Sequence, residues 1–288
     1  MHSEMLTKRV GLSSENEVQI VYSTYVPAEE TPVTEKQIAE AWDSVIDKWN
    51  SKYTEFGDSN RQYVIDPAIF QILGETKGLQ ILDAGCGNGY LCRLLAKKGA
   101  KMTGIDISRR AIEIAEIREK QAPLGIKYYV GSLCNLSMFK DQTFDFIISN
   151  LVLMDLQEID KAIKELHRVL KTKGKLVFSI MHPCFSSSPV HGWEKKPVDS
   201  DRKEDWIYWK VDRYFDRARE EWRYFDFPPT YSFHRTLSDY IKALISNGFT
   251  ITDFEEPVPS KRDMEEHHRE LGNEYDRIPW FLVIGAVK

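Results

Sequence analysis

The sequence predicts an α/β protein built on a doubly wound, mostly parallel sheet. Between residues 79 and 182, short apolar runs typical of strands alternate with amphipathic stretches typical of helices, and a glycine-rich turn follows the first run. Strands that alternate with helices form a parallel sheet covered on both faces, with right-handed crossovers. The expected strands are LQILDA (79–84), KMTGID (101–106), IKYYVG (126–131), FDFIIS (144–149) and GKLVFSI (174–180).

We expect N-terminal helices before this series. Thr34, with Gln37 three residues later, forms a capping-box pattern that opens the first helix. Asp66 and Pro67 are the expected cap and first position of a second helix, which follows a loop over residues 54–65. We expect the apolar residues of the first helix to pack in the core along one stripe, namely Ile38, Trp42, Val45, Ile46 and Trp49.

The chain divides into two expected parts. Residues 1–78 are expected to form an N-terminal arm and helical cap, and residues 79–288 the main α/β domain. Within the domain, residues 182–235 form an aromatic-rich insertion, which favours a substrate lid or small subdomain because disordered linkers are poor in aromatics. In the arm, EVQIVYSTYV (17–26) predicts a strand that is either an added edge strand or a free arm.

The composition argues against several kinds of partner. With a net charge of -5 over 288 residues, the chain lacks the basic excess expected for binding nucleic acid or an anionic membrane surface. No apolar run reaches the ~20 residues that span a bilayer, and the first residues lack the apolar core of a secretory signal, so we expect a cytoplasmic protein. The 4 cysteines form no CxxC pair and are expected to be reduced. We expect no metal site, because adjacent residues such as His267 and His268 point apart on a helix.

The segment ILDAGCGNG (81–89) carries the first chemical signal. Asp83 ends the expected first strand, and the glycines after it allow a tight turn and let a ligand approach the main chain. Asp106 ends the second strand, where a carboxylate can accept hydrogen bonds from both hydroxyls of a ribose. The two strand ends together predict a ligand that contains a nucleoside.

The spacing of the glycines indicates which nucleoside-bearing ligand to expect. A dinucleotide fingerprint needs its third glycine one place after Gly89, where this chain has Tyr90. The acid Asp83 suits a cationic ligand with a sulfonium and an ammonium group better than it suits a pyrophosphate. A nicotinamide-dependent oxidoreductase is therefore the disfavoured alternative.

Three more segments follow the glycine loop in order: GIDIS (104–108), FDFIISNLVL (144–153) and LHRVLKTKGKLVFSI (166–180). With ILDAGCGNG they resemble the motifs of the class I (seven-stranded, Rossmann-like) S-adenosylmethionine-dependent methyltransferase family. The resemblance covers about residues 36–182 and extends more faintly over 236–288. It implies S-adenosylmethionine as cofactor and a seven-stranded sheet that ends in an antiparallel hairpin, which FTITDFEE (249–256) and PWFLVIGAVK (279–288) would supply.

The resemblance also implies which residues bind the cofactor. The first-strand acid and the loop backbone would line the methionine part, the second-strand acid would hold the ribose, and the fourth-strand end would lie near the sulfonium. The family often has an acid after its third strand, where this chain has GSLCN (131–135), so a serine hydroxyl and main chain would take the adenine amine. The expected residues are Tyr53, Arg61 and Tyr63 over the cofactor carboxylate, Asp83, Ala84, Gly85, Cys86, Gly87 and Gly89 in the loop, Asp106 and Ile107 at the ribose and adenine, Ser132 and Leu133 at the adenine, and Asn150 and Leu151 near the sulfonium.

The acceptor side offers three candidate catalytic residues. His182 follows the fifth strand and could take a proton from the acceptor, or it could cap the turn before Pro183. Tyr231 and His234, just before a helix expected at Thr236, are further candidates.

We expect methylation of an oxygen or nitrogen of an aromatic or carboxylate-bearing small molecule, with some insertion aromatics as its wall and others as the subdomain's own core. The alternatives are another reaction of the same cofactor, such as cyclisation, or a noncatalytic binding module. The sequence predicts no oligomeric state.

Overall fold

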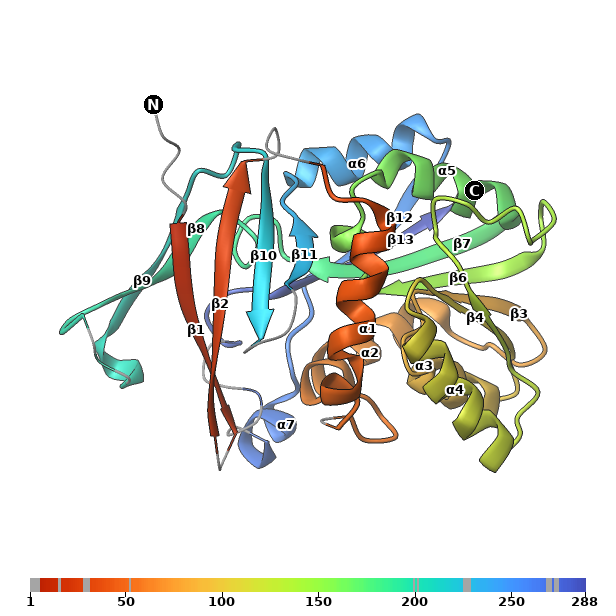
Figure 1. Cartoon of the computed structure of the whole chain (residues 1–288), viewed down its shortest axis with the longest axis horizontal. Helices are drawn as coiled ribbons and strands as arrows, with labels where there is room; N and C mark the ends of the chain where they lie inside the picture. The colour runs from red at the N-terminus through yellow and green to blue at the C-terminus, as the bar shows by residue number, and fades with distance from the viewer. Residues whose placement is uncertain are drawn as a thin grey trace.

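A computed structural model of the chain describes residues 6–14, 17–27, 32–51, 53–198, 200, 202–224, 229–267, 271 and 275–288, and for residues 6–24 and 223–224 it describes the backbone alone. His268 lies outside the described residues. The described residues contain no helix that is both long enough and apolar enough to cross a bilayer. Two sheets dominate the molecule, a central sheet flanked by helices and a smaller sheet on one side (Figure 1).

The central sheet has seven strands in the order β12-β13-β7-β6-β3-β4-β5. Strands β3 to β7 run parallel, whereas β13 is antiparallel to β7 and β12 is antiparallel to β13. This order confirms the doubly wound α/β fold with an antiparallel C-terminal hairpin. The strand bounds are β3 Gln80–Ala84, β4 Lys101–Asp106, β5 Lys127–Val130, β6 Phe144–Asn150, β7 Leu170–Met181, β12 Thr250–Glu255 and β13 Phe281–Val287.

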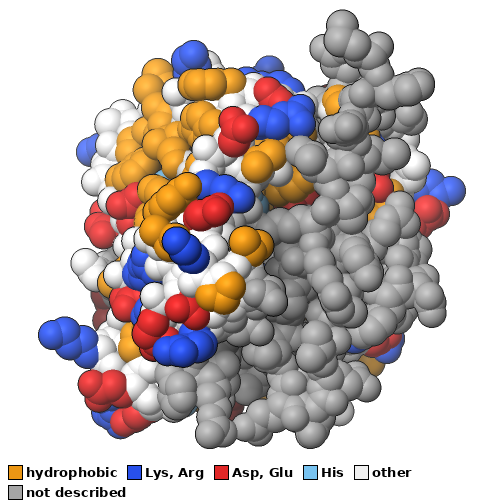
Figure 2. Space-filling view, turned by 90° about the vertical axis from the view of Figure 1, so that its left-hand side faces the viewer, with side chains coloured by type: hydrophobic (Ala, Val, Ile, Leu, Met, Phe, Trp, Pro, Cys, Tyr) orange, Lys and Arg blue, Asp and Glu red, His pale blue; other side chains and the backbone are white. Residues whose placement is uncertain are grey.

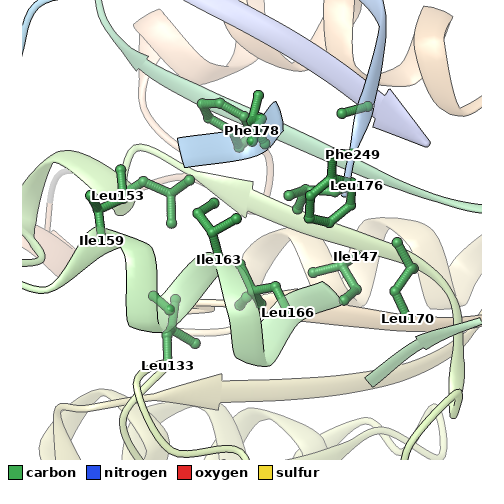
Figure 3. Packing of buried hydrophobic residues seen from close by; sticks show 14 of the residues in the cluster. Leu133, Ile147, Leu153, Ile159, Ile163, Leu166, Leu170, Leu176, Phe178 and Phe249 are labelled. Carbon is green, nitrogen blue, oxygen red and sulfur yellow. The ribbon is translucent and has the colours of Figure 1, made fainter. Parts of the chain in front are cut away.

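Helices cover both faces of the central sheet, and each face has its own core (Figure 1). Successive side chains of a strand point to opposite faces, so in β7 Leu176 and Phe178 enter the core beneath α5 and α6, while Val177 enters the core beneath α2 and α3. Figure 3 shows the first of these cores, where Ile163 and Leu166 of α5 face the strands. The helix bounds are α1 Glu35–Ser51, α2 Asp66–Leu73, α3 Tyr90–Lys97, α4 Arg109–Gln121, α5 Ile159–Val169, α6 Leu237–Ser246 and α7 Lys261–Glu266.

Of the two expected N-terminal helix starts, one is confirmed and the other is wrong. The Thr34 capping box is confirmed: the amide of Thr34 donates to Gln37 Oε1 over 2.9 Å, and the amide of Gln37 donates to Thr34 Oγ1 over 3.3 Å. Asp66 is not a cap, because a π-helical turn over Arg61–Ile65 runs directly into α2. The Asp66 carboxyl is buried, and its Oδ1 accepts from the hydroxyl of Tyr90 at the start of α3 and from Nδ2 of Asn150 at the end of β6.

The buried face of α1 is narrower than the sequence suggested. Only Ile38, Ala41 and Val45 of this helix are buried, and the expected core packing of Trp42 and Trp49 is wrong in that both remain partly exposed. Alanine at position 41 lets the helix approach its neighbours closely, so the bulkier indoles lie at the rim of the contact.

The smaller sheet, which we call the lid sheet, joins two N-terminal strands to two strands of the insertion. Its strand order is β1-β2-β10-β11, with bounds Leu6–Ser14, Glu17–Pro27, Ala218–Tyr224 and Thr230–Phe233. Strand β2 pairs antiparallel with β10, so the expected N-terminal strand is neither a free arm nor an edge of the central sheet. The sequence analysis did not predict β1. The boundary placed at residue 78 remains a prediction, although the lid sheet joins segments from both sides of it.

The rest of the insertion forms a hairpin of β8, Val190–Lys195, and β9, Trp206–Asp212. Its indoles pack on one another: the ring centroid of Trp193 lies 5.3 Å from that of Trp206 and 5.2 Å from that of Trp209, which lies 5.4 Å from Trp280. Trp193, Trp206 and Trp209 therefore belong to the insertion's own core, which also packs on Trp280 just before β13. On the side of the molecule shown in Figure 2, exposed hydrophobic side chains are interspersed with both signs of charge.

Candidate cofactor and acceptor site

The turn between β3 and α3 has a conformation that requires glycine. Gly85 and Gly89 adopt φ values of 88° and 76°, in the left-handed region that side chains disfavour. A Cβ on Gly85 would lie 2.3 Å from Val152 Cγ2, and one on Gly89 would lie 2.5 Å from the Tyr128 hydroxyl oxygen. Gly87 differs, because a Cβ there would meet no atom within 4 Å. The loop is thus packed at its two ends and open at its centre.

Asp106 at the end of β4 binds the open centre of this loop. Its Oδ2 accepts from the Gly87 amide over 2.8 Å, and its Oδ1 accepts from the Ser108 amide over 2.8 Å. A carboxylate oxygen has two lone pairs, so each oxygen keeps the capacity to accept one hydroxyl. Burial raises the pKa of Asp106, and the two backbone amides oppose that shift.

Asp83 lies at the end of β3 and is buried. Burial raises its pKa to about 7, against the opposing effect of a hydrogen bond from Cys92 Sγ over 3.3 Å. Cys86 lies beside it within the loop, and burial raises the pKa of that thiol to about 11, so the sulfur is a neutral packing group. A buried carboxyl with a pKa near 7 is poised to ionise when a cation binds.

The end of β3 and the glycine loop open onto a pocket that encloses about 410 Å³ of free space, its open mouth included, while Asp106 lies outside its lining and contacts it through Gly87. Tyr53 and Arg61, from the segment between α1 and α2, close one side of the pocket. Arg61 binds the Asp58 carboxylate, and its guanidinium carbon lies 5.3 Å from the ring centroid of Tyr53. The pocket is lined by Ile46, Asn50, Tyr53, Arg61, Asp83, Gly85, Cys86, Gly87, Asn88, Tyr90, Leu91 and Asn150.

A buried polar network supports the pocket at the end of β6. Asn150 Nδ2 donates to Asp66 Oδ1 and to the Tyr90 hydroxyl, both over 2.9 Å, and Asn150 Oδ1 accepts from Ser179 Oγ over 2.7 Å. Leu151, next in sequence, has a φ of 58°, which is rare for a branched side chain. Hydrogen bonds from its backbone amide to the carbonyl oxygen and the hydroxyl of Ser179 maintain this conformation. The network fixes the backbone where the resemblance places the sulfonium.

The expected adenine contacts lie beyond the pocket lining. Ile107 is partly exposed, and Leu133 is buried in the core. The Ser132 hydroxyl donates to Glu35 Oε1 of α1 over 2.5 Å, and its oxygen accepts from the Cys134 amide over 3.0 Å. Glu35 thus brings a carboxylate to the position where the chain lacks the acid after its third strand. The sequence analysis did not identify this residue.

The same corner holds a group of possible metal ligands. Among the described residues, one ligand atom each of Glu35, Cys134 and Glu158 lies within 4.8 Å of the others. Glu35 and Glu158 are exposed, and exposed acidic groups commonly lie together without an ion. We assign no metal to this group.

The structure places the three catalytic candidates away from the pocket lining. His182 is buried, and both of its ring nitrogens are engaged: Nδ1 accepts from the Cys184 amide over 3.2 Å, and Nε2 lies 2.9 Å from Glu256 Oε1. His234 is also buried, with Nε2 2.8 Å from the Tyr214 carbonyl oxygen. Burial lowers the pKa of both histidines. This geometry favours a capping role for His182.

Two tyrosines among the candidates also lie elsewhere. Tyr63 stacks on His267 with ring centroids 4.1 Å apart and does not line the pocket. Tyr231 lies in β11, where its ring centroid is 5.7 Å from the guanidinium carbon of Arg219. Their proposed roles remain predictions.

Several pocket residues escaped the sequence analysis. Asn50 ends up in the lining because its Oδ1 accepts from Asn88 Nδ2 over 3.0 Å and from Arg118 Nη2 over 2.7 Å. Tyr90 was noted only as a departure from the dinucleotide pattern, yet its hydroxyl binds Asp66. One available signal was Asn50's position four residues after Ile46, which places both on one face of α1.

The residues present fit S-adenosylmethionine. The loop is open at Gly87, the Asp83 carboxyl suits an ammonium group, and the Asp106 oxygens have acceptor capacity beside the open loop. A pyrophosphate at the loop would meet the Asp83 carboxyl, so the alternative dinucleotide fits poorly.

Comparison with known proteins agrees with this geometry. A family model described as a methyltransferase domain matches residues 82–178. A ubiquinone biosynthesis O-methyltransferase of Coxiella burnetii is 31% identical over 165 residues, which cover 56% of this chain and 68% of the relative. An uncharacterized protein of Haemophilus influenzae is 27% identical over 230 residues, which cover 78% of this chain and 87% of that protein.

A solved structure gives the same answer for the fold. The crystal structure of an S-adenosylmethionine-dependent methyltransferase from Mesorhizobium loti is 28% identical, with a TM-score of 0.65, and covers 82% of this chain and 100% of its own. The pattern of strands, the glycine loop and the paired acids at the strand ends therefore have a common explanation. The chain belongs to the class I S-adenosylmethionine-dependent methyltransferases and is an enzyme that uses this cofactor.

Proposed function

We propose that this methyltransferase acts on an oxygen or nitrogen of a small molecule. The observation that carries the proposal is the lid sheet, whose strand β11 packs on the turn Leu153–Asp155 that directly follows β6. In this proposal the lid sheet covers the side from which the methyl acceptor enters. A covered entrance favours a small acceptor over a macromolecule, and the net charge of -5 points the same way.

In this proposal each end of the cofactor has its own partners. Asp83 binds the ammonium group, while Arg61 with Tyr53 binds the carboxylate. Asp106 accepts the ribose hydroxyls beside Gly87. When bound, S-adenosylmethionine supplies a methyl group on a positively charged sulfur.

The protein's contribution is mainly positional. Methyl transfer needs the acceptor in line behind the methyl group and water kept out of the way. The bonds of Asn150 to Asp66, Tyr90 and Ser179 keep the end of β6 rigid, so the backbone of Leu151 presents a fixed wall to the reacting groups. The lid sheet then excludes solvent from the opposite side.

A calorimetric titration tests the cofactor assignment first. Purified protein is titrated with S-adenosylhomocysteine, with a nicotinamide dinucleotide as control. We expect micromolar binding of the first compound alone. Binding of the dinucleotide alone would contradict our interpretation of the glycine loop.

Transfer of a tritiated methyl group tests the acceptor class. The protein is incubated with labelled S-adenosylmethionine and a cell extract separated into small molecules and macromolecules. Label in the small-molecule fraction is the expected result. Product analysis then distinguishes methylation from another reaction of the same cofactor, and label confined to macromolecules would disprove the proposal.

A further inference from the structure

We propose that the methyl acceptor carries a basic nitrogen, and that Asp155 binds this nitrogen and takes its proton before transfer. The inference rests on the proposed small-molecule methyl transfer and names the substrate class for the same site. Asp155 was not among the residues that the sequence analysis selected.

Asp155 lies close to the cofactor pocket along the chain and in space. It ends the short turn after β6, five residues after Asn150, which lines the pocket. Its amide donates to the carbonyl of Val152 over 2.8 Å, and Val152 in turn packs against Gly85 of the glycine loop. The carboxyl is therefore carried on the segment that touches the loop.

The surroundings of Asp155 are those of a recessed group that solvent still reaches. Asp155 is partly buried and keeps some accessible surface. Strand β11 packs on the turn that carries Asp155, and its residue Ser232 opposes the rise in the pKa of the carboxyl. The cofactor side and the lid sheet thus meet at this one side chain.

A second acid lies next to Ser232 on the lid. Glu220 of β10 is the register partner of Ser232, and Tyr25 of β2 is in turn the partner of Glu220. Residues directly opposite in an antiparallel pair point to the same face of a sheet, so Glu220 shares the face of the lid that Ser232 turns toward Asp155. Glu220 is only 4% exposed. Two carboxyl groups therefore border the acceptor side.

The cations near Asp155 are already engaged. The positive charges of Arg61 and Arg235 both lower the pKa of Asp155. However, Arg61 binds Asp58, and Arg235 donates to the carbonyl oxygens of Phe233, Leu156 and Gln157. Asp106 adds a further negative charge, which raises the pKa of Asp155.

Burial raises the pKa of Asp155 well above its usual range, and a cationic ligand would reverse that shift. An acceptor that carries a carboxylate at this position would gain no ion pair, because the Asp155 carboxyl is either neutral or negative.

The chemistry of transfer to nitrogen requires a group in this place. An ammonium has no lone pair and must lose a proton before it can react. In the proposed step this proton passes to an oxygen of the Asp155 carboxylate. The nitrogen lone pair then forms the bond to the methyl carbon as the carbon–sulfur bond breaks, with its electron pair left on sulfur. The sulfonium becomes a neutral thioether, and the methylated nitrogen takes up the positive charge.

Ligand binding to the protein saturated with S-adenosylhomocysteine tests the proposal without turnover. The probes are three matched series on phenylethyl, indolylethyl and hexyl groups, each as the amine, the alcohol and the carboxylate. We expect an amine to bind at least tenfold more tightly than its matched alcohol and carboxylate. Equal or tighter binding of alcohols or carboxylates, or a panel in which no amine binds, would overturn the proposal.

Two variants place the preference at Asp155. Asp155→Asn should abolish the tenfold preference for amines, while Asp160→Asn, which removes an exposed acid in the first turn of α5, should retain it. Ser232→Ala keeps the charge and should weaken amine binding by a few-fold, which provides a milder test if Asp155→Asn does not fold. Unchanged affinity for S-adenosylhomocysteine is the check on folding. An undiminished preference in Asp155→Asn would remove this residue from the site.

The labelling experiment separates failure of this inference from failure of the proposed function. Label in small molecules that a cation exchanger retains supports both. Label in neutral or acidic small molecules alone leaves the proposed function intact and refutes the basic acceptor. Label in macromolecules alone refutes both.

Discussion

On the cofactor side, one continuous segment from Asp83 to Gly89 supplies the turn, the acid and the open backbone, and Asp106 completes it within twenty-five residues. On the proposed acceptor side, the corresponding surface would come from β2, the turn after β6, β10 and β11, which are spread over some two hundred positions. A nucleotide-like ligand common to a family can be bound by a local motif, because the motif needs only a strand end and a helix start. The acceptor surface is assembled by tertiary structure, and its chemistry becomes visible only there.

The largest effect expected on the cofactor side comes from Gly85→Ala. A Cβ there would combine the left-handed φ with a 2.3 Å approach to Val152 Cγ2, and we expect a loss of roughly 3 kcal/mol in stability and of S-adenosylhomocysteine binding. Gly87→Ala is the matched control, with the strain but no clash, and should cost about 1 kcal/mol. Chemical denaturation measures both, and adding Val152→Ala should partly restore the first variant. Equal losses at the two glycines would contradict the packing argument.

Asp106→Ala should weaken S-adenosylhomocysteine binding at least tenfold, about 1.4 kcal/mol. The variant loses the expected ribose acceptor and the bond that orders Gly87. Titration calorimetry measures the change, with Asp141→Ala, an acid whose side chain is 71% exposed, as the charge control. A dissociation constant equal to that of the unmodified protein would remove Asp106 from the site.

The pH dependence of cofactor binding should follow Asp83. Its pKa of about 7 means that the free protein is increasingly protonated there as the pH falls, whereas the ammonium of the ligand binds the ionised form. Affinity for S-adenosylhomocysteine should therefore fall by about tenfold between pH 8 and pH 6. Asp83→Asn should bind more weakly at pH 8 and show a flatter profile. A steep profile that persists in the variant would assign the titration to another group, such as Asp66, whose pKa burial also raises to about 7.

The smallest effect is expected at His182. Because both ring nitrogens are engaged within the fold, His182→Ala should cost about 1 kcal/mol of stability and change turnover less than threefold. Steady-state kinetics, with an acceptor identified by the labelling experiment, measures turnover, and a thermal unfolding curve measures stability. Turnover slowed tenfold or more at unchanged S-adenosylhomocysteine affinity would restore His182 as the base.

The sequence was informative where function depends on local order along the chain. The alternation of strands and helices predicted the central sheet, and the spacing of Asp83, the glycines and Asp106 predicted a nucleoside-bearing ligand. It was uninformative where partners are distant. Nothing near Tyr25 indicates that its strand pairs with β10, and the apolar run LVLMDL (151–156) does not reveal what its one acid, Asp155, faces. Tyr90 shows a third case, in which the sequence marked the right residue without revealing its partner Asp66.

The pairing of β2 with β10 has a consequence for how the protein is made. Strand β2 leaves the ribosome early, and its partner follows about 190 residues later, which at 5–20 residues per second is a delay of roughly 10–40 s. During that interval the parallel strands and the glycine loop can already assemble, while the first strands await their neighbours. The cofactor pocket can thus form before the lid sheet is complete. Until β10 is synthesised, the hairpin of β1 and β2 has an unpaired edge on β2.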